Sequence, residues 1–368
     1  MEQRLRVALT LEQCWHRVPG GTAVAAIGMA NALDRDGSLD IIGVAARHKD
    51  APGAEWTPPV AVRHLPLPRV ALYEAWHRLR RPAVQRATGD VDVIHATTIA
   101  VPPRTAPLVV TIHDLAFLRD PSHFTARGLS FFKRGLSLAK RDAHAIHCPS
   151  EATARDCVTA GVDEAKIHVV PLGIETAPVT DTDVEAAKER HHLVRPYVLW
   201  SGTIEPRKNL SGLLTAWGAL DEDVDLVLVG PRGWNEDLNA LTARARRKPR
   251  VLGFVARSEL NALYAGAAVV CWPSMREGFG FPVLEAMAQG APVVTSTGTS
   301  TEEIAGDAAL LVDPKDPAAI ADAIRRLLSD EPLARKLSDA GRARAAEFTW
   351  DRTAIGLRDV YRGLKGMA

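Results

Sequence analysis

Apolar residues occur along this chain in short continuous runs rather than in alternation with polar ones. The first series of runs covers 5–11, 41–44, 60–65, 91–95, 108–112, 145–148 and 168–171. The second series covers 197–201, 224–230, 251–254, 268–272 and 292–296, with 309–312 as a candidate edge strand. Continuous Val, Ile and Leu runs separated by helical stretches are typical of parallel strands covered on both faces. The pattern predicts two consecutive α/β units.

Helical periodicity fills the intervals between these predicted strands. Helices are expected at 23–33, 210–220, 238–247, 258–264 and 282–289, and from 318 onward the chain is helical, with breaks before 338 and 350. The stretch 176–188, which contains Pro178 and several acidic residues, interrupts the alternation of strands and helices. We therefore place a linker at 177–195.

The composition limits the possible classes of protein and agrees with two α/β units. The 368 residues are 46% hydrophobic and 24% charged, which fits two ordinary globular cores. A net charge of +1 gives no overall signal for nucleic-acid binding. The four cysteines form no C-x-x-C pair, so neither a metal cluster nor a disulfide framework is expected. Because there is neither a signal-peptide pattern nor a run of eighteen apolar residues, we expect a cytoplasmic protein.

The stretch Glu-Gly-Phe-Gly-Phe-Pro-Val-Leu-Glu at 277–285 combines a glycine-rich turn with the start of a helix. Pro282 suits the first helical turn, because its ring presets φ and its missing N–H has no partner there. Amides at such a helix start, preceded by Gly278 and Gly280, form a site for an anion. The motif follows the predicted strand 268–272, and open α/β sheets bind ligands at the carboxyl ends of their strands.

Two carboxylates frame this motif, Glu277 on the loop and Glu285 in the first helical turn. Their separation lets them reach different parts of one ligand. The alternative is an ordinary strand-to-helix turn, with Glu285 favouring the helix dipole and Glu277 solvated.

A basic pair, Arg207 and Lys208, follows the first strand of the second unit. The planar fork of an arginine and the point charge of a lysine together suit a diphosphate; a solvated surface loop is the alternative. In the first unit, Gly20-Gly21 closes the loop after the first strand. His113 stands at the end of the predicted strand 108–112, and His95 is a weaker candidate of the same kind.

Four motifs in this order, Gly20-Gly21, Thr111-Ile-His-Asp-Leu115, Arg207-Lys208-Asn209 and Glu277-x7-Glu285, resemble the retaining glycosyltransferases of GT-B fold, glycosyltransferase family four. The resemblance covers nearly the whole chain. The segments 72–76 and 115–121 look most like the bacterial mannosyltransferase-like branch. The resemblance implies an α/β GT-B architecture, in which two Rossmann-like domains have parallel sheets that face an interdomain cleft. It divides the chain into an acceptor domain at 1–176, a linker at 177–195 and a donor domain at 196–349, with the last helix, 350–368, crossing back onto the first domain.

The resemblance also implies roles for matching residues. Arg207 and Lys208 would hold the diphosphate, Glu277 the sugar and Glu285 the ribose, and His113 would lie near the anomeric carbon. The catalytic set would be His113, Glu277, Arg207 and Lys208. The implied donor-binding set is Gly21, Gly202, Arg207, Lys208, Phe254, Val255, Glu277, Gly278, Phe279, Gly280, Leu284 and Glu285.

The implied reaction is the transfer of a hexose with retained configuration, in which the leaving diphosphate accepts the proton of the acceptor hydroxyl. The best prediction for the donor is GDP-mannose, with a UDP-sugar as runner-up. The acceptor would be a glycan, a lipid-linked or a small-molecule hydroxyl, and no nucleic acid is involved. No metal or other cofactor is expected, because the Asp-x-Asp triplets at 90–92, 221–223 and 223–225 precede strands and therefore lie at the opposite sheet edge.

Three further hypotheses arise from the sequence. Arg78, Arg80, Arg81 and Arg86 lie on a predicted helix, which would suit a peripheral contact with an anionic membrane; an ordinary solvated helix face is the favoured alternative. The second hypothesis is a nucleotide-sugar epimerase of GT-B fold, which would need acid and base carboxylates. The third is a non-catalytic sugar-nucleotide binding protein, for which a degraded motif would be expected, and here every motif position is intact.

Overall fold

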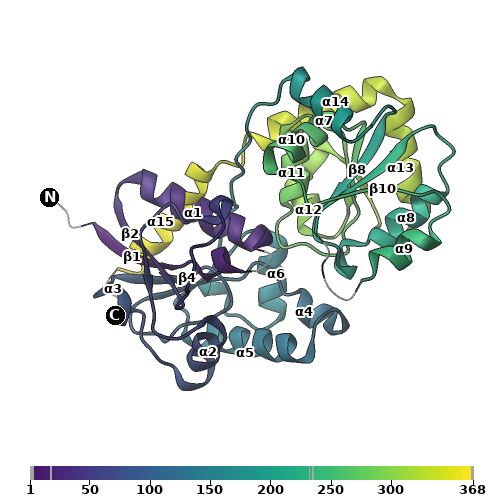
Figure 1. Cartoon of the computed structure of the whole chain (residues 1–368). Coiled ribbons are helices and arrows are strands. Elements are labelled where there is room, and N and C mark those ends of the chain that lie inside the picture. Colours follow the sequence, from purple (N-terminus) through teal and green to yellow (C-terminus); the bar gives the residue numbers. More distant parts are fainter. Residues whose placement is uncertain (1–3, 17–18, 232, 234–235, 366–368) are drawn as a thin grey trace. The chain divides into compact units, whose positions relative to one another are not determined.

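The computed structural model describes residues 4–16, 19–231, 233 and 236–365. Contacts divide the chain into two compact units. Unit 1 comprises Met1–Gly173 and Thr349–Ala368, and unit 2 comprises Ile174–Phe348. Each unit contains one parallel sheet with helices packed on it (Figure 1). The prediction of two Rossmann-like units is confirmed.

The described sheet of unit 1 has seven parallel strands in the order β3-β2-β1-β4-β5-β6-β7. Its strands are β1 (Leu5–Thr10), β2 (Leu39–Ala45), β3 (Val62–His64), β4 (Val93–Ala96), β5 (Leu108–Thr111), β6 (Ala145–Cys148) and β7 (Ile167–Val169). Residues of β4, β5 and β6 are fully buried, as continuous apolar runs require.

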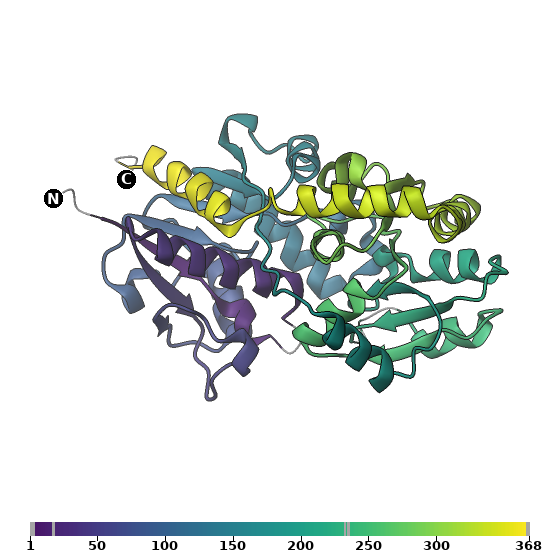
Figure 2. The same cartoon turned by 90° about the horizontal axis from the view of Figure 1, so that it is seen from above.

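The helices of unit 1 cover this sheet. They are α1 (Gly20–Asp36), α2 (Arg69–Glu74), a π-helix (Ala75–Leu79), α3 (Gln85–Thr88), α4 (Ala116–Arg119), α5 (Ala126–Asp142), α6 (Glu151–Thr159) and α15 (Trp350–Gly363), with short 3₁₀ turns at Glu12–Trp15, Ala54–Trp56, Pro121–His123 and Glu164–Lys166. The last helix, α15, packs along α1 (Figure 2). A Cβ at Gly28 of α1 would lie 2.1 Å from the ring of Trp350, so only glycine permits this approach.

The arginine-rich stretch of unit 1 differs from the single helix expected for it. The π-helix ends at Leu79, the next residue, Arg80, has a φ of 53°, and Arg86 lies on the separate helix α3. The Arg80 guanidinium donates to the carbonyl oxygens of Trp76, Val101 and Pro102 and to the carboxylate of Asp142. Arg80 is therefore a structural residue, and the four arginines do not share one helix face.

Unit 2 contains a described sheet of six parallel strands in the order β10-β9-β8-β11-β12-β13. Its strands are β8 (Tyr197–Ser201), β9 (Asp225–Val229), β10 (Arg250–Gly253), β11 (Val269–Trp272), β12 (Val293–Ser296) and β13 (Leu310–Val312). The helices are α7 (Asp181–Arg190), α8 (Leu210–Gly218), α9 (Leu238–Arg244), α10 (Arg257–Ala265), α11 (Phe281–Ala288), α12 (Ser300–Ala305), α13 (Pro317–Ser329) and α14 (Glu331–Ala345), with 3₁₀ turns at Pro206–Lys208 and Gly306–Ala308.

The segment 177–195, expected as a linker, contains the regular helix α7. Thr180 and Asp183 form a capping box at its start, in which each side chain accepts a hydrogen bond from the other's backbone N–H. The helix packs against α10 within unit 2. The acidic residues that suggested a linker are therefore partly the acidic first turn of a helix.

In both sheets the strand order reverses beside the first strand of the unit. β1 lies between β2 and β4, and β8 lies between β9 and β11. Connections leave such a point toward opposite faces of the sheet, so the loops at the carboxyl ends diverge and make room for a ligand. In unit 2 the loops that follow β8 and β11 carry the basic pair and the glycine-rich motif.

Candidate active site

The loop after β8 presents the basic pair in a fixed conformation. Pro206–Lys208 form a 3₁₀ turn, and Asn209 then takes a left-handed conformation with φ 55°. The Asn209 side chain accepts from the N–H of Gly212 at the start of α8 and donates to the carbonyl oxygens of Pro273 and Pro314. Asn209 thus ties this loop to the loop after β11.

Glu205 holds both cations of the pair. Its carboxylate accepts from Arg207 Nε at 3.2 Å and from Arg207 Nη2 at 3.0 Å, an arrangement in which two parallel bonds fix the guanidinium plane. The same carboxylate lies 3.5 Å from Lys208 Nζ. Glu205 is 4% exposed, so these charges interact where water screens them weakly.

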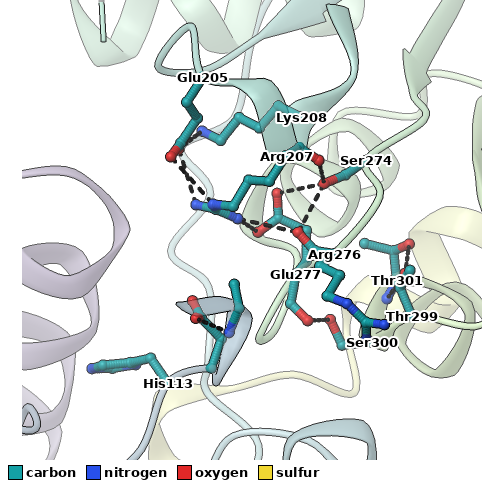
Figure 3. Close-up of polar contacts among 12 residues, drawn as sticks. His113, Glu205, Arg207, Lys208, Ser274, Arg276, Glu277, Thr299, Ser300 and Thr301 are labelled. Atoms are coloured by element: carbon teal, nitrogen blue, oxygen red, sulfur yellow. Dashed lines mark hydrogen bonds and ion pairs between the residues drawn. The ribbon is translucent and has the colours of Figure 1, made fainter. Parts of the chain in front are cut away.

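Glu277 contacts the same arginine from the loop after β11. Arg207 Nη1 donates to Glu277 Oε2 at 2.8 Å, and Figure 3 shows the Arg207 side chain between the two carboxylates. Ser274 Oγ lies 3.1 Å from Glu277 Oε1, and Ser300 Oγ donates to the Glu277 carbonyl oxygen. We call Glu205, Arg207, Lys208 and Glu277 the charged network.

Lys208 is the most enclosed cation of the charged network. Its side chain is 11% exposed, and Nζ lies 5.3 Å from the centre of the Trp272 ring, whose face attracts a cation. Burial lowers the pKa of Lys208, the carboxylate of Glu205 opposes that change, and the charge of Arg207 adds to it. A Cβ at Gly202 would lie 2.9 Å from Nζ and 2.6 Å from the Trp272 ring. Gly202 therefore makes room for the lysine.

The glycine-rich motif forms the start of α11 as expected from the sequence. Gly280 precedes the helix with φ 119°, and Pro282 lies in its first turn. A Cβ at Gly280 would also meet Thr301 at 2.9 Å. The amide of Leu284, a member of the implied donor-binding set, donates a long hydrogen bond of 3.4 Å to the Gly280 carbonyl oxygen.

Glu285 faces a different set of partners from Glu277. It is 6% exposed, and its Oε1 lies 2.9 Å from Nη2 of Arg257 on α10. Burial, and then the negative charge of Glu285, raise the pKa of Tyr264. The structure thus separates the two carboxylates of the motif, since one joins the charged network and the other lies against α10.

Phe254 and Val255, two members of the implied donor-binding set, directly follow β10. Gly253 has a φ of 74°, Phe254 is 67% exposed and Val255 is half-buried. A cavity of about 470 Å³ lies beside the end of β10, lined by Gly230, Pro231, Leu238, Asn239, Thr242, Val251, Leu252, Gly253 and Phe254. Unit 2 thus has open space beside the carboxyl ends of β9 and β10.

His113 follows β5 in unit 1. Its Nε2 lies 2.9 Å from the carbonyl oxygen of Thr97, which only accepts, so Nε2 carries the hydrogen and Nδ1 the lone pair. Burial lowers the pKa of His113, although the Thr97 bond and the charge of Asp114 oppose this. The ring is therefore neutral at pH 7. Thr153 Oγ1 donates to the His113 carbonyl oxygen and fixes the loop.

His95 is not available for a ligand, and the sequence-based candidacy of this residue is wrong. The side chain is fully buried, and its two ring nitrogens lie 2.6 Å from the Tyr361 hydroxyl and 2.7 Å from the Thr111 hydroxyl. Both hydrogen-bonding positions of the ring are taken, so His95 is a core residue. Gly20 and Gly21, the other candidates of unit 1, form the start of α1.

Two family models match the chain, one in each half. Residues 19–178 match the model described as Glycosyltransferase Family 4, and residues 181–344 match Glycosyl transferases group 1. O-antigen chain mannosyltransferase B of Escherichia coli is 30% identical over 304 residues, which are 80% of each chain. The chain belongs to glycosyltransferase family 4. The family predicted from the four sequence motifs is confirmed.

Two further relatives are similar to this family 4 glycosyltransferase over most of its length. MMP alpha-(1->4)-mannosyltransferase of Mycolicibacterium hassiacum is 32% identical over 74% of this chain and 71% of its own. D-inositol 3-phosphate glycosyltransferase of Xylanimonas cellulosilytica is 30% identical over 93% of this chain and 91% of its own. The chain is thus similar to several mannosyltransferases over most of its length.

Solved structures share the fold of this glycosyltransferase. Anabaena HepE in complex with UDP and glucose has a TM-score of 0.76 at 20% identity and covers 98% of this chain and all of its own. WaaG, a glycosyltransferase involved in lipopolysaccharide biosynthesis, has a TM-score of 0.73 at 16% identity over 98% of this chain and all of its own. These likenesses establish the fold alone.

The Asp-x-Asp triplets of the glycosyltransferase lie at the amino ends of β4 and β9. Asp92 accepts from the N–H of Arg6, Asp223 pairs with Arg195, and Asp225 pairs with Arg250. Across the described residues, no group of three His, Cys, Asp or Glu side chains is arranged to hold a metal ion. None of the described helices is both long and apolar enough to cross a membrane.

Sequence reasoning missed two residues of this site, Glu205 and Ser274. Glu205 stands in the loop after β8, three residues before Lys208, a spacing that brings side chains together in a helical turn. From this three-residue spacing, the contact between Glu205 and Lys208 could have been predicted. Ser274 gave no comparable signal, because its contact with Glu277 depends on how the loop after β11 folds.

Proposed function

We propose that this family 4 glycosyltransferase transfers mannose from GDP-mannose to a hydroxyl acceptor, with retention of configuration and without a metal ion. One observation carries the proposal: Arg207 and Lys208 are held at the carboxyl end of β8, beside the glycine-rich start of α11. A site of this kind suits a diphosphate, because fixed cations and helix amides favour negative charge.

The choice of mannose rests on the relatives. Two of the similar proteins are named as mannosyltransferases, from Escherichia coli and Mycolicibacterium hassiacum. A UDP-sugar is the alternative donor, since the HepE structure of the same fold contains UDP and glucose. The acceptor is a hydroxyl of a glycan, a lipid-linked saccharide or a small molecule.

In the proposed reaction, the bond between the anomeric carbon and the diphosphate oxygen breaks as the acceptor oxygen bonds to the same face of that carbon. The acceptor proton passes to the leaving diphosphate. Negative charge therefore grows on the diphosphate while positive charge spreads over the sugar ring. Arg207 and Lys208 stabilise the negative charge on the diphosphate, and the Glu277 carboxylate stabilises the positive charge on the sugar ring. Preorganised charges are most effective where charge develops in the transition state.

The remaining residues bind the donor in this proposal. Glu285 accepts from the ribose hydroxyls, and backbone of Phe254 and Val255 lines the base. Amides of Gly278, Phe279 and Gly280 bind the sugar hydroxyls. His113, neutral and with a lone pair on Nδ1, positions the sugar or the acceptor.

A peripheral contact with an anionic membrane is a separate proposal. Of the four arginines that suggested this contact, Arg78 lines a groove of about 480 Å³ in unit 1 together with Glu74, Arg127, Ser130 and Arg134. Glu74 pairs with both Arg78 and Arg134, so Arg127 adds the further positive charge on which the proposal rests. Sedimentation with vesicles containing anionic lipid would test it, and equal recovery with neutral vesicles would contradict it.

A donor panel tests the proposed function. Thermal unfolding is followed with GDP-mannose, GDP, UDP-glucose and UDP at increasing concentrations, and then product formation is followed in EDTA. We expect GDP-mannose to stabilise the protein by about 2.7 kcal/mol at a hundredfold excess over its Kd. The product should keep the donor's anomeric configuration in NMR spectra. If no nucleotide stabilises the protein, the donor site is excluded. Activity that is lost in EDTA and restored by Mg²⁺ would exclude the metal-free mechanism. A product with inverted configuration would exclude retention.

A further inference from the structure

We infer that Glu205 is a positioning residue for this reaction: its carboxylate orients the guanidinium of Arg207 and keeps the ammonium of Lys208 in place, and charged, for the donor diphosphate. The inference rests on the proposed function, because it assumes that the basic pair binds a diphosphate. None of the motifs that led to the family includes this residue.

The contacts of Glu205 differ in kind from those of Glu277. Both Glu205 oxygens contact cations, Oε1 those of Arg207 and Lys208 and Oε2 that of Arg207. Glu277 instead offers one oxygen to Arg207 and the other to Ser274. Glu205 therefore serves to hold the two cations, whereas Glu277 is suited to contact both Arg207 and a sugar.

The surroundings of Lys208 explain why it needs a carboxylate. The Trp272 ring lies on one side, Gly202 approaches closely, and Arg207 is the neighbouring cation. Glu205 and, farther away, Glu277 are the negative groups that act on it. A buried ammonium loses its proton readily when no opposite charge is near. Glu205 therefore supplies the charge that keeps Lys208 protonated at working pH.

Charge balance within the network also points to Glu205. Two carboxylates and two cations cancel, so Arg207 and Lys208 rest in a neutral environment before the diphosphate arrives. Glu205 also acts on a third carboxyl, since burial and then the Glu205 charge raise the pKa of Glu236. The negative charge of Glu205 thus also acts on Glu236, but the two Glu205 oxygens contact the basic pair.

The test compares Glu205→Gln with Glu205→Asp and with a control, Glu222→Gln. Glu222 pairs with Arg325 at 3.0 Å in the same unit and precedes β9, at the opposite sheet edge from the charged network. Affinity for GDP, or for UDP if the wild type prefers it, is measured by calorimetry from pH 6.5 to 10. Phosphate groups are fully ionised over most of this range and arginine stays charged, so loss of affinity at high pH reports Lys208.

Glu205→Gln is expected to move this alkaline loss of affinity to lower pH by about one unit, the effect of losing an opposite charge within 4 Å. Glu205→Asp restores the carboxylate and should return most of the shift. Glu222→Gln should give the wild-type profile. Circular dichroism and thermal unfolding without ligand show whether each variant folds.

The outcomes separate this inference from the function on which it rests. If the wild type binds no nucleotide, the proposed function fails. If the wild type binds and Glu205→Gln keeps the wild-type pH profile, or if Glu205→Asp shifts as far as Glu205→Gln, the role of Glu205 is overturned. Should Glu205→Gln not fold, the Glu205→Asp profile alone decides, because a shortened carboxylate moves away from Lys208 and predicts a smaller shift in the same direction.

Discussion

The carboxyl edges of the two sheets use opposite kinds of polar chemistry. In unit 2 the edge carries the charged network, in which Arg207 lies between two carboxylates. In unit 1 the loops around His113 are joined by hydrogen bonds between neutral groups: His113 Nε2 donates to the Thr97 carbonyl oxygen, Thr97 Oγ1 accepts from Gln13, and the Thr97 N–H donates to Thr10 Oγ1. A charged network suits a diphosphate whose charge changes during reaction, whereas neutral groups such as His113 suit hydroxyl groups.

The histidines follow the same division. The chain has twelve, and all except His191 and His192 belong to unit 1. Within unit 1, His95 and His147 form a buried chain of hydrogen bonds through Thr111, from the Tyr361 hydroxyl to the Val170 carbonyl oxygen. Each bond in this chain has one donor when both rings are neutral, so an added proton would have no acceptor. The core of unit 1 therefore depends on neutral imidazoles, whereas the candidate site of unit 2 depends on ion pairs.

The largest effect is expected from removing the buried cation of unit 2. Lys208→Met keeps the length of the side chain but loses the charge that faces the diphosphate as it leaves. Loss of one preorganised group of this kind lowers kcat by about 100- to 1000-fold. Lys336→Met changes an exposed lysine of α14 and serves as the control. Single-turnover rates that fall less than tenfold for Lys208→Met would mean that charge does not develop beside this residue.

A smaller effect is expected from the carboxylate of α11. Glu285→Gln weakens a charge-assisted bond to the ribose, worth about 1.5–3 kcal/mol, so nucleoside diphosphate should bind roughly ten- to a hundredfold more weakly. Glu277→Gln should alter this affinity little, because Arg207 keeps its two bonds to Glu205, and should lower kcat instead. Calorimetry beside single-turnover rates separates the two.

Arg257→Ala provides the control for that comparison, since Arg257 is the residue paired with Glu285. If Arg257→Ala weakens nucleotide binding as much as Glu285→Gln does, the loss reflects the ion pair and not the ribose. Equal loss of affinity at Glu277 and Glu285 would contradict the separate roles of the two carboxylates.

The fold could be predicted from the sequence because its signals are local. Continuous apolar runs indicate the strands, and the strand pattern alone places residues that follow strand ends, such as Arg207 and Glu277, on one sheet edge. The predictions that were wrong depended on contacts between residues that lie far apart in the sequence. His95 resembled His113, since both stand at the end of a predicted strand, but Tyr361, 266 residues away, covers His95.

Side-chain direction was the second kind of information that the sequence lacked. The role of Glu205 depends on its carboxylate turning toward Arg207 rather than toward solvent, and the expected arginine-rich helix ends because Arg80 turns back to bond three carbonyl oxygens. The helix α7 was missed for another reason. Its capping residues Thr180 and Asp183 are visible in the sequence, but the neighbouring proline and acidic residues favoured a linker.

A moderate effect, confined to unit 1, is expected from its buried histidines. Burial lowers the pKa of His147 to about 4, below the value near 6.5 of an unfolded chain. Protonation therefore favours unfolding, so the stabilisation is complete above pH 6.5 and is lost between pH 6.5 and 4, at about 1.4 kcal/mol per pH unit. His147→Gln should remove that part of the slope when unfolding of β4–β6 is followed by hydrogen exchange in urea. Leu136→Ala, a buried change in the same unit, should lower stability without changing the slope, and an unchanged slope for His147→Gln would contradict the account.

The smallest effect is expected from a neutral hydroxyl that supports the charged network. Ser274 Oγ lies within 3.1 Å of three acceptors, Glu277 Oε1 and the carbonyl oxygens of Arg207 and Arg276, but has one hydrogen to donate. Ser274→Ala removes one hydroxyl hydrogen that is shared among these three acceptors, a loss worth about 1 kcal/mol, so kcat should fall about fivefold with little change in nucleotide affinity. Thr295→Val removes a buried hydroxyl that donates to the Trp272 carbonyl oxygen in the same unit, and should lower the melting temperature while leaving kcat unchanged. If Ser274→Ala reduced kcat as strongly as Lys208→Met, the position of Glu277 would depend on this serine and not on its ion pair with Arg207.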